Sequence, residues 1–134
     1  KEDRIYSLRV YVNDQYPQRL PDLVVFKSPE PMPNGDDWNG SHDTHTYRRM
    51  YGFLHICHWH WAAWKTENMI FQVFNKGKEW LEAYEKYLTN GKMELEQMEL
   101  TEEEQTVVQE DPNEIMLAEL FRLLAICNHR ISFS

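Results

Sequence analysis

Cysteine, basic charge and long apolar runs are all scarce in this chain of 134 residues. Its two cysteines, Cys57 and Cys127, are too few for the disulfide framework of a small secreted protein, so we expect a reducing, cytoplasmic setting. No run of 18 apolar residues occurs, so we expect neither a membrane-spanning helix nor a membrane partner. The first residues include neither an initiator Met nor the apolar stretch of a secretory signal, which predicts a trimmed or excised piece.

Basic residues are in the minority, since 14 Lys and Arg stand against 22 Asp and Glu and leave a net charge of −8. Residues 92–114 hold nine acidic residues and one basic residue, so this segment carries the whole surplus and the rest of the chain is neutral. A protein that binds DNA or RNA needs a basic stripe to neutralise phosphates. We therefore expect no nucleic-acid partner.

Apolar and β-branched residues mark three strands in the first half of the chain. Residues 4–12 alternate between the two faces of a strand, with the more apolar face on the even positions. Two further strands are expected, at residues 22–27 and 52–59. Between them, residues 28–45 are rich in Pro, Gly and acidic side chains, which predicts a long surface loop without regular structure.

Apolar side chains recur at three- and four-residue steps over residues 66–89, and this spacing predicts a long amphipathic helix. Thr66 is expected to cap its start, and Asn90 with Gly91 to end it. Gly77 lies within the apolar stripe, where glycine costs about 1 kcal/mol of helix propensity relative to alanine. Its presence there predicts that the helix packs closely on the sheet.

The last third of the chain is expected to be helical in part. Residues 93–110 combine helix formers with high negative charge, and an Asp-Pro-Asn-Glu sequence at residue 111 predicts the start of an apolar helix over residues 112–127. The fold class that we expect is α+β, with a small antiparallel β-meander packed on the long helix and a C-terminal helix. Residues 1–92 would form the core, and residues 93–134 the acidic segment plus C-terminal helix of the same domain.

Four short motifs occur in a fixed order along residues 4–92. They read His45-Thr46-Tyr47, Gly52-Phe53-Leu54-His55-Ile56, Glu79-Trp80-Leu81-Glu82-Ala83-Tyr84-Glu85 and Thr89-Asn90-Gly91. Together with a Tyr-Pro sequence and a second Pro between the first two strands, this order resembles the ubiquitin-conjugating enzyme fold. It is most similar to bacterial ubiquitin-conjugating-like proteins, several of which are found in antiphage operons.

The catalytic positions of the resembled family are filled differently here. In that family the nucleophilic cysteine follows the motif histidine by ten positions, and counting ten from His45 leads to His55, which cannot form a thioester. The asparagine that steadies the oxyanion corresponds to Tyr47. The resemblance therefore implies an atypical or inactive protein of a ubiquitin-like conjugation pathway. Its partners would be a ubiquitin-like protein and its activating enzyme or another partner protein, and no cofactor is expected.

Cys57 offers an alternative nucleophile. It follows His55 by two positions in the expected strand, and the period of two places both side chains on one face. An imidazole at His55 or His45 could lower the pKa of the thiol or act as its base. In this active alternative, Cys57 accepts the C-terminal carboxylate of a ubiquitin-like protein as a thioester and passes it to an amine. The competing interpretation is a small buried strand residue.

The same segment leaves a third hypothesis open, that of a zinc-stabilised domain. Residue types that bind zinc are close together in the sequence: His55, Cys57, His58 and His60. Strand alternation places His58 on the opposite face from the first two, so they converge only if the following loop folds back. The nearby tryptophans are expected to cap the core rather than to form a recognition patch: Trp59, Trp61 and Trp64.

Overall fold

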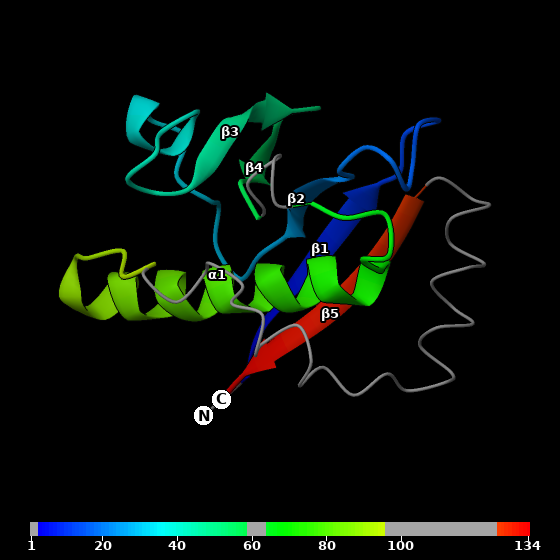
Figure 1. Ribbon diagram of the computed structural model, residues 1–134. Coiled ribbons are helices and arrows are strands. Elements are labelled where there is room, and N and C mark those ends of the chain that lie inside the picture. The colour runs from blue at the N-terminus through cyan, green and yellow to red at the C-terminus, as the bar shows by residue number, and fades with distance from the viewer. Residues whose placement is uncertain (1–2, 59–63, 96–125) are drawn as a thin grey trace.

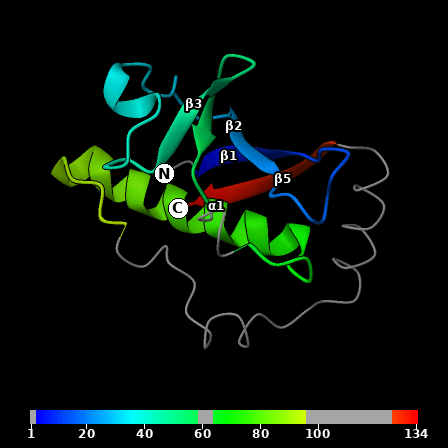
Figure 2. The ribbon, with the colours of Figure 1, turned by 45° about the horizontal axis from the view of Figure 1, so that its top comes forward.

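The computed structural model describes residues 3–58, 64–95 and 126–134 (Figure 1). Its elements are, in chain order, β1 (Arg4–Tyr11), β2 (Asp22–Lys27), the 3-10 turn η1 (Asp36–Trp38), β3 (Thr46–Met50), β4 (Phe53–Ile56), α1 (Ile70–Asn90) and β5 (Ile126–Phe133). All strand pairs are antiparallel, and α1 lies across one face of the sheet (Figures 1 and 2). The fold class is α+β, as expected.

The sheet has five strands in the order β3-β4-β2-β1-β5. The three strands expected from the sequence correspond to β1, β2 and β4, and they are neighbours in the sheet. β3 and β5 were not expected, and they form the two edges. The whole sheet is not a meander, because β4 rather than β3 pairs with β2. The charged sequence of β3 gives no clear period of two, so it has no sequence signal of its own. In β5, Cys127, Ile131 and Phe133 alternate with polar residues, but His129 interrupts the apolar face.

The alternation expected in β1 is confirmed by the side chains beneath α1. Tyr6, Leu8 and Val10 are fully buried, and they belong to the apolar core together with Leu23 of β2 and Trp80 of α1. The other face of β1 is only partly covered. Burial of the apolar face stabilises the packing of the sheet on α1. The opposite face of the sheet does not contact the helix.

The long loop between β2 and β3 contributes to the core, which corrects the expectation of a loop that lies wholly on the surface. Residues 36–38 form the short 3-10 turn η1, and the Trp38 side chain is 8% exposed. Its ring packs edge-on against Trp80 and Tyr87 of α1. The indole of Trp80 donates a hydrogen bond of 2.8 Å to the Thr44 carbonyl, so the loop is fastened to α1 at two points.

α1 begins four residues later than expected. Its N-cap is Met69, whose backbone N–H donates a 2.6 Å hydrogen bond to the Gln72 side chain, and Thr66 instead bonds to Glu67 in the preceding loop. The predicted end is confirmed, since the helix stops at Asn90 and Gly91 adopts a φ of 75°. No helix in the described part of the chain combines the length and the apolar content that crossing a membrane requires.

The prediction of a C-terminal helix over residues 112–127 is wrong for its last two residues. Ile126 and Cys127 lie in β5, which pairs with β1 along its whole length. The rest of that expected helix, and most of the expected helical structure in residues 93–110, lie outside the described residues; residues 93–95 are not helical. Residues 126–133 form a strand and not the end of a helix, and Cys127 and Ile131 bury their side chains beside β1.

At Gly77 the backbone of α1 lies close to the sheet. A Cβ at this position would lie 2.5 Å from Leu8 Cδ1 and 3.0 Å from Leu23 Cδ2. Both leucines are fully buried, so neither has free space into which it can move. The close packing expected from the sequence is confirmed.

We expect Gly77→Ala to lower the free energy of unfolding by about 1–2 kcal/mol, because overpacking of up to about 3 kcal/mol outweighs a helix-propensity gain of about 1 kcal/mol. Urea unfolding measures the change. The matched control is Asn75→Ala, at an exposed position of the same helix, which should stabilise the protein slightly. Stabilisation by both variants would show that the contact at Gly77 is not close.

Candidate functional site

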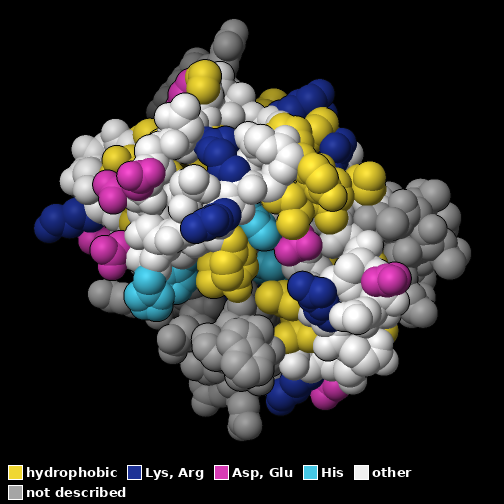
Figure 3. Space-filling model, turned by 90° about the horizontal axis from the view of Figure 1, so that it is seen from above, with side chains coloured by type: hydrophobic (Ala, Val, Ile, Leu, Met, Phe, Trp, Pro, Cys, Tyr) yellow, Lys and Arg dark blue, Asp and Glu magenta, His cyan; other side chains and the backbone are white. Residues whose placement is uncertain are grey.

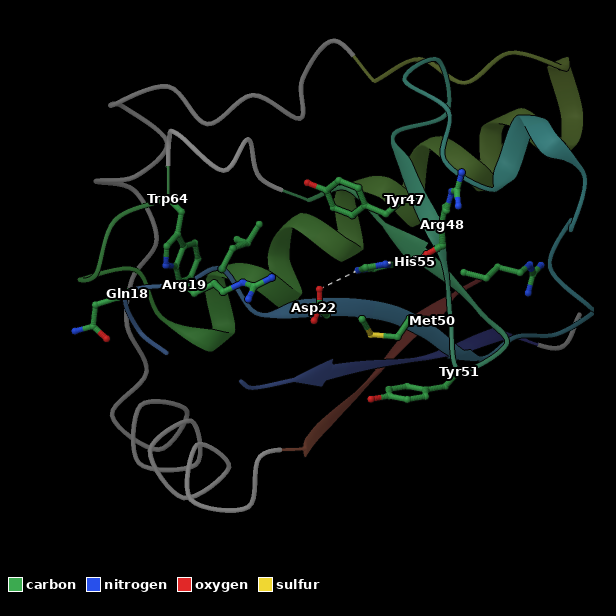
Figure 4. Close-up of a pocket in the computed structure, with 11 residues that line it drawn as sticks. Gln18, Arg19, Asp22, Tyr47, Arg48, Met50, Tyr51, His55 and Trp64 are labelled. Carbon is green, nitrogen blue, oxygen red and sulfur yellow. Dashed lines mark hydrogen bonds and ion pairs between the residues drawn. The ribbon is translucent and has the colours of Figure 1, made fainter. Parts of the chain in front are cut away.

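A groove of about 730 Å³ opens on the face of the sheet that does not contact α1 (Figure 4). Leu23 and Ile56 point into the core, so their neighbours Asp22 and His55 point into the groove because side chains alternate along a strand. Seen from above, histidine side chains lie in the middle of one face of the molecule, between hydrophobic and basic side chains (Figure 3). The groove is also lined by Arg19, Leu20, Met50, Tyr51 and Trp64.

His55 forms the floor of the groove, and an oxygen atom lies close to each of its ring nitrogens. Its Nδ1 lies 3.1 Å from the Arg48 carbonyl oxygen, and its Nε2 lies 3.2 Å from Asp22 Oδ1. The ring is 7% exposed and lies 5.0 Å, between centroids, from the ring of Tyr47. The Nδ1 contact fixes the ring, whereas Nε2 has no hydrogen-bond partner among the described residues, so its contact with Asp22 is electrostatic only.

A shift in the pairing of β3 with β4 creates this arrangement. Tyr47 pairs with His55 and Met50 pairs with Phe53, so β3 has one residue more than β4 between the two pairs. Such a bulge bends the strand and turns a backbone group out of the ladder. Here the freed carbonyl of Arg48 is the partner of His55 Nδ1.

Tyr47 brings together two of the residues that the sequence singled out. Its ring contacts His55, and its hydroxyl is a hydrogen-bond partner of the Cys57 side chain. Burial raises the pKa of Tyr47 above its ordinary value, and the hydrogen bond with Cys57 raises it further. The phenol therefore keeps its proton at neutral pH and can donate it to the sulfur atom or to an oxyanion beside it.

His45 approaches Cys57 through its backbone. The Cys57 amide donates a 2.8 Å hydrogen bond to the His45 carbonyl, while the imidazole of His45 stacks on His42 with 5.4 Å between centroids. β4 ends at Ile56, so Cys57 is the first residue after the strand, and its side chain is partly exposed. The four expected residues, Cys57, His55, His45 and Tyr47, thus lie within one small region.

Two charged residues of the groove were missed by reasoning from the sequence. Asp22 is the first residue of β2, and in the sequence it looks like an ordinary residue at the start of a strand. Only the pairing of Val24 with His55 brings the Asp22 carboxylate close to the imidazole. Arg19 follows a turn, and its exposed guanidinium points toward the groove (Figure 4). No carboxylate among the described residues lies within ion-pair distance of it. The sequence holds no signal for either, because both depend on register.

The described residues contain no cluster that supports the hypothesis of a zinc-stabilised domain. No three side chains of His, Cys, Asp or Glu there converge in a way that could hold a metal ion. His60, Trp59 and Trp61 lie outside the described residues. Trp64 is partly buried, and its indole donates a 2.8 Å hydrogen bond to the Pro17 carbonyl at one end of the groove.

Comparisons of the chain with protein-family models, with curated proteins and with solved structures found no match in any of the three.

The two cysteines should differ in reactivity. Cys127 is 2% exposed, and burial raises its pKa to about 12, so its thiolate fraction at pH 8 is about one in ten thousand. Cys57 is partly exposed beside the groove. We expect iodoacetamide to label Cys57 first in the folded protein, as read by mass spectrometry of peptides. Labelling in urea, where both should react, is the control, and equal rates in the folded protein would contradict the burial of Cys127.

His58 should make the fold sensitive to acid. Its ring is 2% exposed, and burial lowers its pKa from 6.5 to about 4, so it is neutral in the folded protein at pH 6. The unfolded chain takes up this proton below pH 6.5, which removes up to about 3 kcal/mol of the free energy of unfolding between pH 6.5 and pH 4.

Urea unfolding at several pH values measures this contribution as the difference between the wild type and His58→Gln, which should lose less stability as the pH falls. His42→Gln, at an exposed histidine, is the matched control and should follow the wild type. The same pH slope in all three proteins would show that His58 is protonated in the folded state.

Proposed function

We propose that the protein acts in a ubiquitin-like protein conjugation pathway as an atypical member of the conjugating-enzyme fold that binds its partner without forming a thioester. The observation that carries the proposal is the state of His55. It stands where the resembled family has its nucleophile, its ring is buried, its Nδ1 contacts the Arg48 carbonyl, and its Nε2 lies 3.2 Å from Asp22 Oδ1. A buried ring fixed in this way serves structure and binding rather than acyl transfer.

The groove beside His55 supports a binding role. An extended chain terminus can lie along its floor between Tyr51 and Trp64, which lie at opposite ends in Figure 4. The exposed guanidinium of Arg19 offers a charged donor for a terminal carboxylate, and guanidinium groups bind carboxylates in a bidentate manner. The partner that fits this chemistry is the free C-terminal tail of a ubiquitin-like protein.

A second candidate function is acyl transfer through Cys57, and the contact with Tyr47 favours it. The thiolate of Cys57 would attack the activated carbonyl of a ubiquitin-like protein, and the donor's thiol would leave with the proton from Cys57. The Tyr47 hydroxyl, a hydrogen-bond partner of the Cys57 side chain, could donate to the oxyanion of that step. An acceptor amine would then displace Cys57 and take over the acyl group.

Restoring a cysteine at position 55 tests the first candidate. The probe is ubiquitin joined through its C-terminus to mercaptoethanesulfonate as a thioester, and intact-mass spectrometry detects the transfer. We expect no adduct on the wild type and a dithiothreitol-sensitive adduct on the double variant His55→Cys with Cys57→Ser, because the new thiol lies beside Tyr47. Cys57→Ser alone is the matched control.

An adduct on wild-type Cys57 would contradict the proposed binding function and support acyl transfer through Cys57. The proposal as a whole would be contradicted if neither the wild type nor the double variant gained an adduct, and if free ubiquitin shifted no amide resonance of the groove in a titration followed by nuclear magnetic resonance.

A further inference from the structure

Basic side chains gather in the sheet although the whole chain is acidic. The five described strands contain six Arg or Lys residues and a single acidic residue, Asp22, which lies against His55. One of the six, Arg4, points toward α1 and pairs with Glu85 and Glu30. Arg9 and Arg130 lie on the face of the sheet away from α1, and Lys27 lies beside Phe26 on the same face, so this part of the face is locally positive.

Arg9 lies in the middle of this face and is held rigidly. Its guanidinium carbon lies 3.4 Å from the centroid of the Phe26 ring. Its Nε donates a 2.8 Å hydrogen bond to the Asn128 side chain of β5, and its Nη1 lies 3.5 Å from the Tyr11 hydroxyl. Phe26 is itself supported edge-on by Phe53 at 5.1 Å. The Arg9 side chain is therefore already ordered before a ligand binds, so binding loses little side-chain conformational entropy.

No carboxylate neutralises Arg9 within the described residues, where the ion pairs involve other groups. Lys27 lies 5.8 Å from the same Phe26 ring, and Arg130 pairs opposite Ser7, two positions from Arg9 on the same face. A guanidinium stacked on an aromatic ring keeps its remaining N–H groups in one plane. This geometry suits a carboxylate that approaches from solvent.

Tyr51 supplies an apolar contact next to this charge. Its side chain is 75% exposed, the largest exposed fraction among the described large hydrophobic residues, and its ring rests edge-on against Tyr11 at 5.0 Å. It occupies the first turn position between β3 and β4 with a φ of 52°, followed by Gly52 at 81°. A two-residue turn of this type favours Asn at the first position, so a bulky aromatic there serves something other than the turn.

We propose that the face of the sheet around Arg9 and Tyr51 docks an extended, acidic segment of a partner protein. Arg9 binds a carboxylate of the segment, Lys27 and Arg130 attract its other acidic side chains, and Tyr51 covers an apolar side chain between them. Charge complementarity identifies this occupant, since Arg9, Lys27 and Arg130 lie there and none of them has a carboxylate within ion-pair distance among the described residues. The inference does not depend on the proposed role in conjugation.

The test uses a fluorescein-labelled peptide of alternating Glu and Phe, and fluorescence anisotropy measures its affinity. We expect Arg9→Gln and Tyr51→Asn each to weaken binding by about fivefold or more, as residues at the centre of an interface do. Lys78→Gln removes the same charge from an exposed position of α1 and should change the affinity by less than about twofold. A peptide with Gln in place of Glu should not bind.

Folding controls separate docking from stability. Tyr51→Asn should raise the melting temperature because Asn fits the turn, so weaker binding by this variant cannot come from unfolding. Arg9→Lys keeps the charge and should still weaken binding, because it loses the planar fork. The inference is overturned if the peptide does not bind, if Arg9→Gln and Tyr51→Asn bind it like the wild type, if amide shifts map to α1, or if only a single-stranded oligonucleotide binds this face.

Discussion

The close contact between α1 and the sheet at Gly77 is the constraint on which the rest of the structure depends. Because this residue has no side chain, the helix backbone approaches Leu8 and Leu23 directly, and the apolar core lies on that side of the sheet. His55, Asp22 and Arg9 lie on the other face. The histidine groove and the arginine surface share that face because the core occupies the opposite one.

Small irregularities of the backbone shape the groove. The bulge in β3 turns the Arg48 carbonyl toward His55, and the tight turn at Tyr51 and Gly52 places an exposed aromatic ring at the rim. Regular strands would have placed these groups in the hydrogen-bonded ladder. The groove therefore combines a rigid floor, in which His55 is held between two elements, with a rim whose side chains are open to solvent.

The fold could be predicted where a residue's environment follows from its neighbours in sequence. Alternation in β1, the apolar stripe of α1 and its stop at Gly91 were all evident in this way. The family resemblance grouped Tyr47, His55 and Cys57 in one candidate site, but the pairing of β3 with β4 that brings them together was not expected. β5 was missed because its pairing partner lies more than a hundred residues earlier. The start of α1 was misplaced because the N-cap is Met69, whose N–H bonds to the Gln72 side chain, and not Thr66.

The sequence by itself determined the α+β class and the faces of β1 and α1. Those features depend on local periodicity and on residue identity. Only the tertiary structure decided that Asp22 and the Arg48 carbonyl hold His55, and that Phe26 and Asn128 hold Arg9. The reason is that strand register and strand order, which no local pattern encodes, set the distances between residues far apart in the chain.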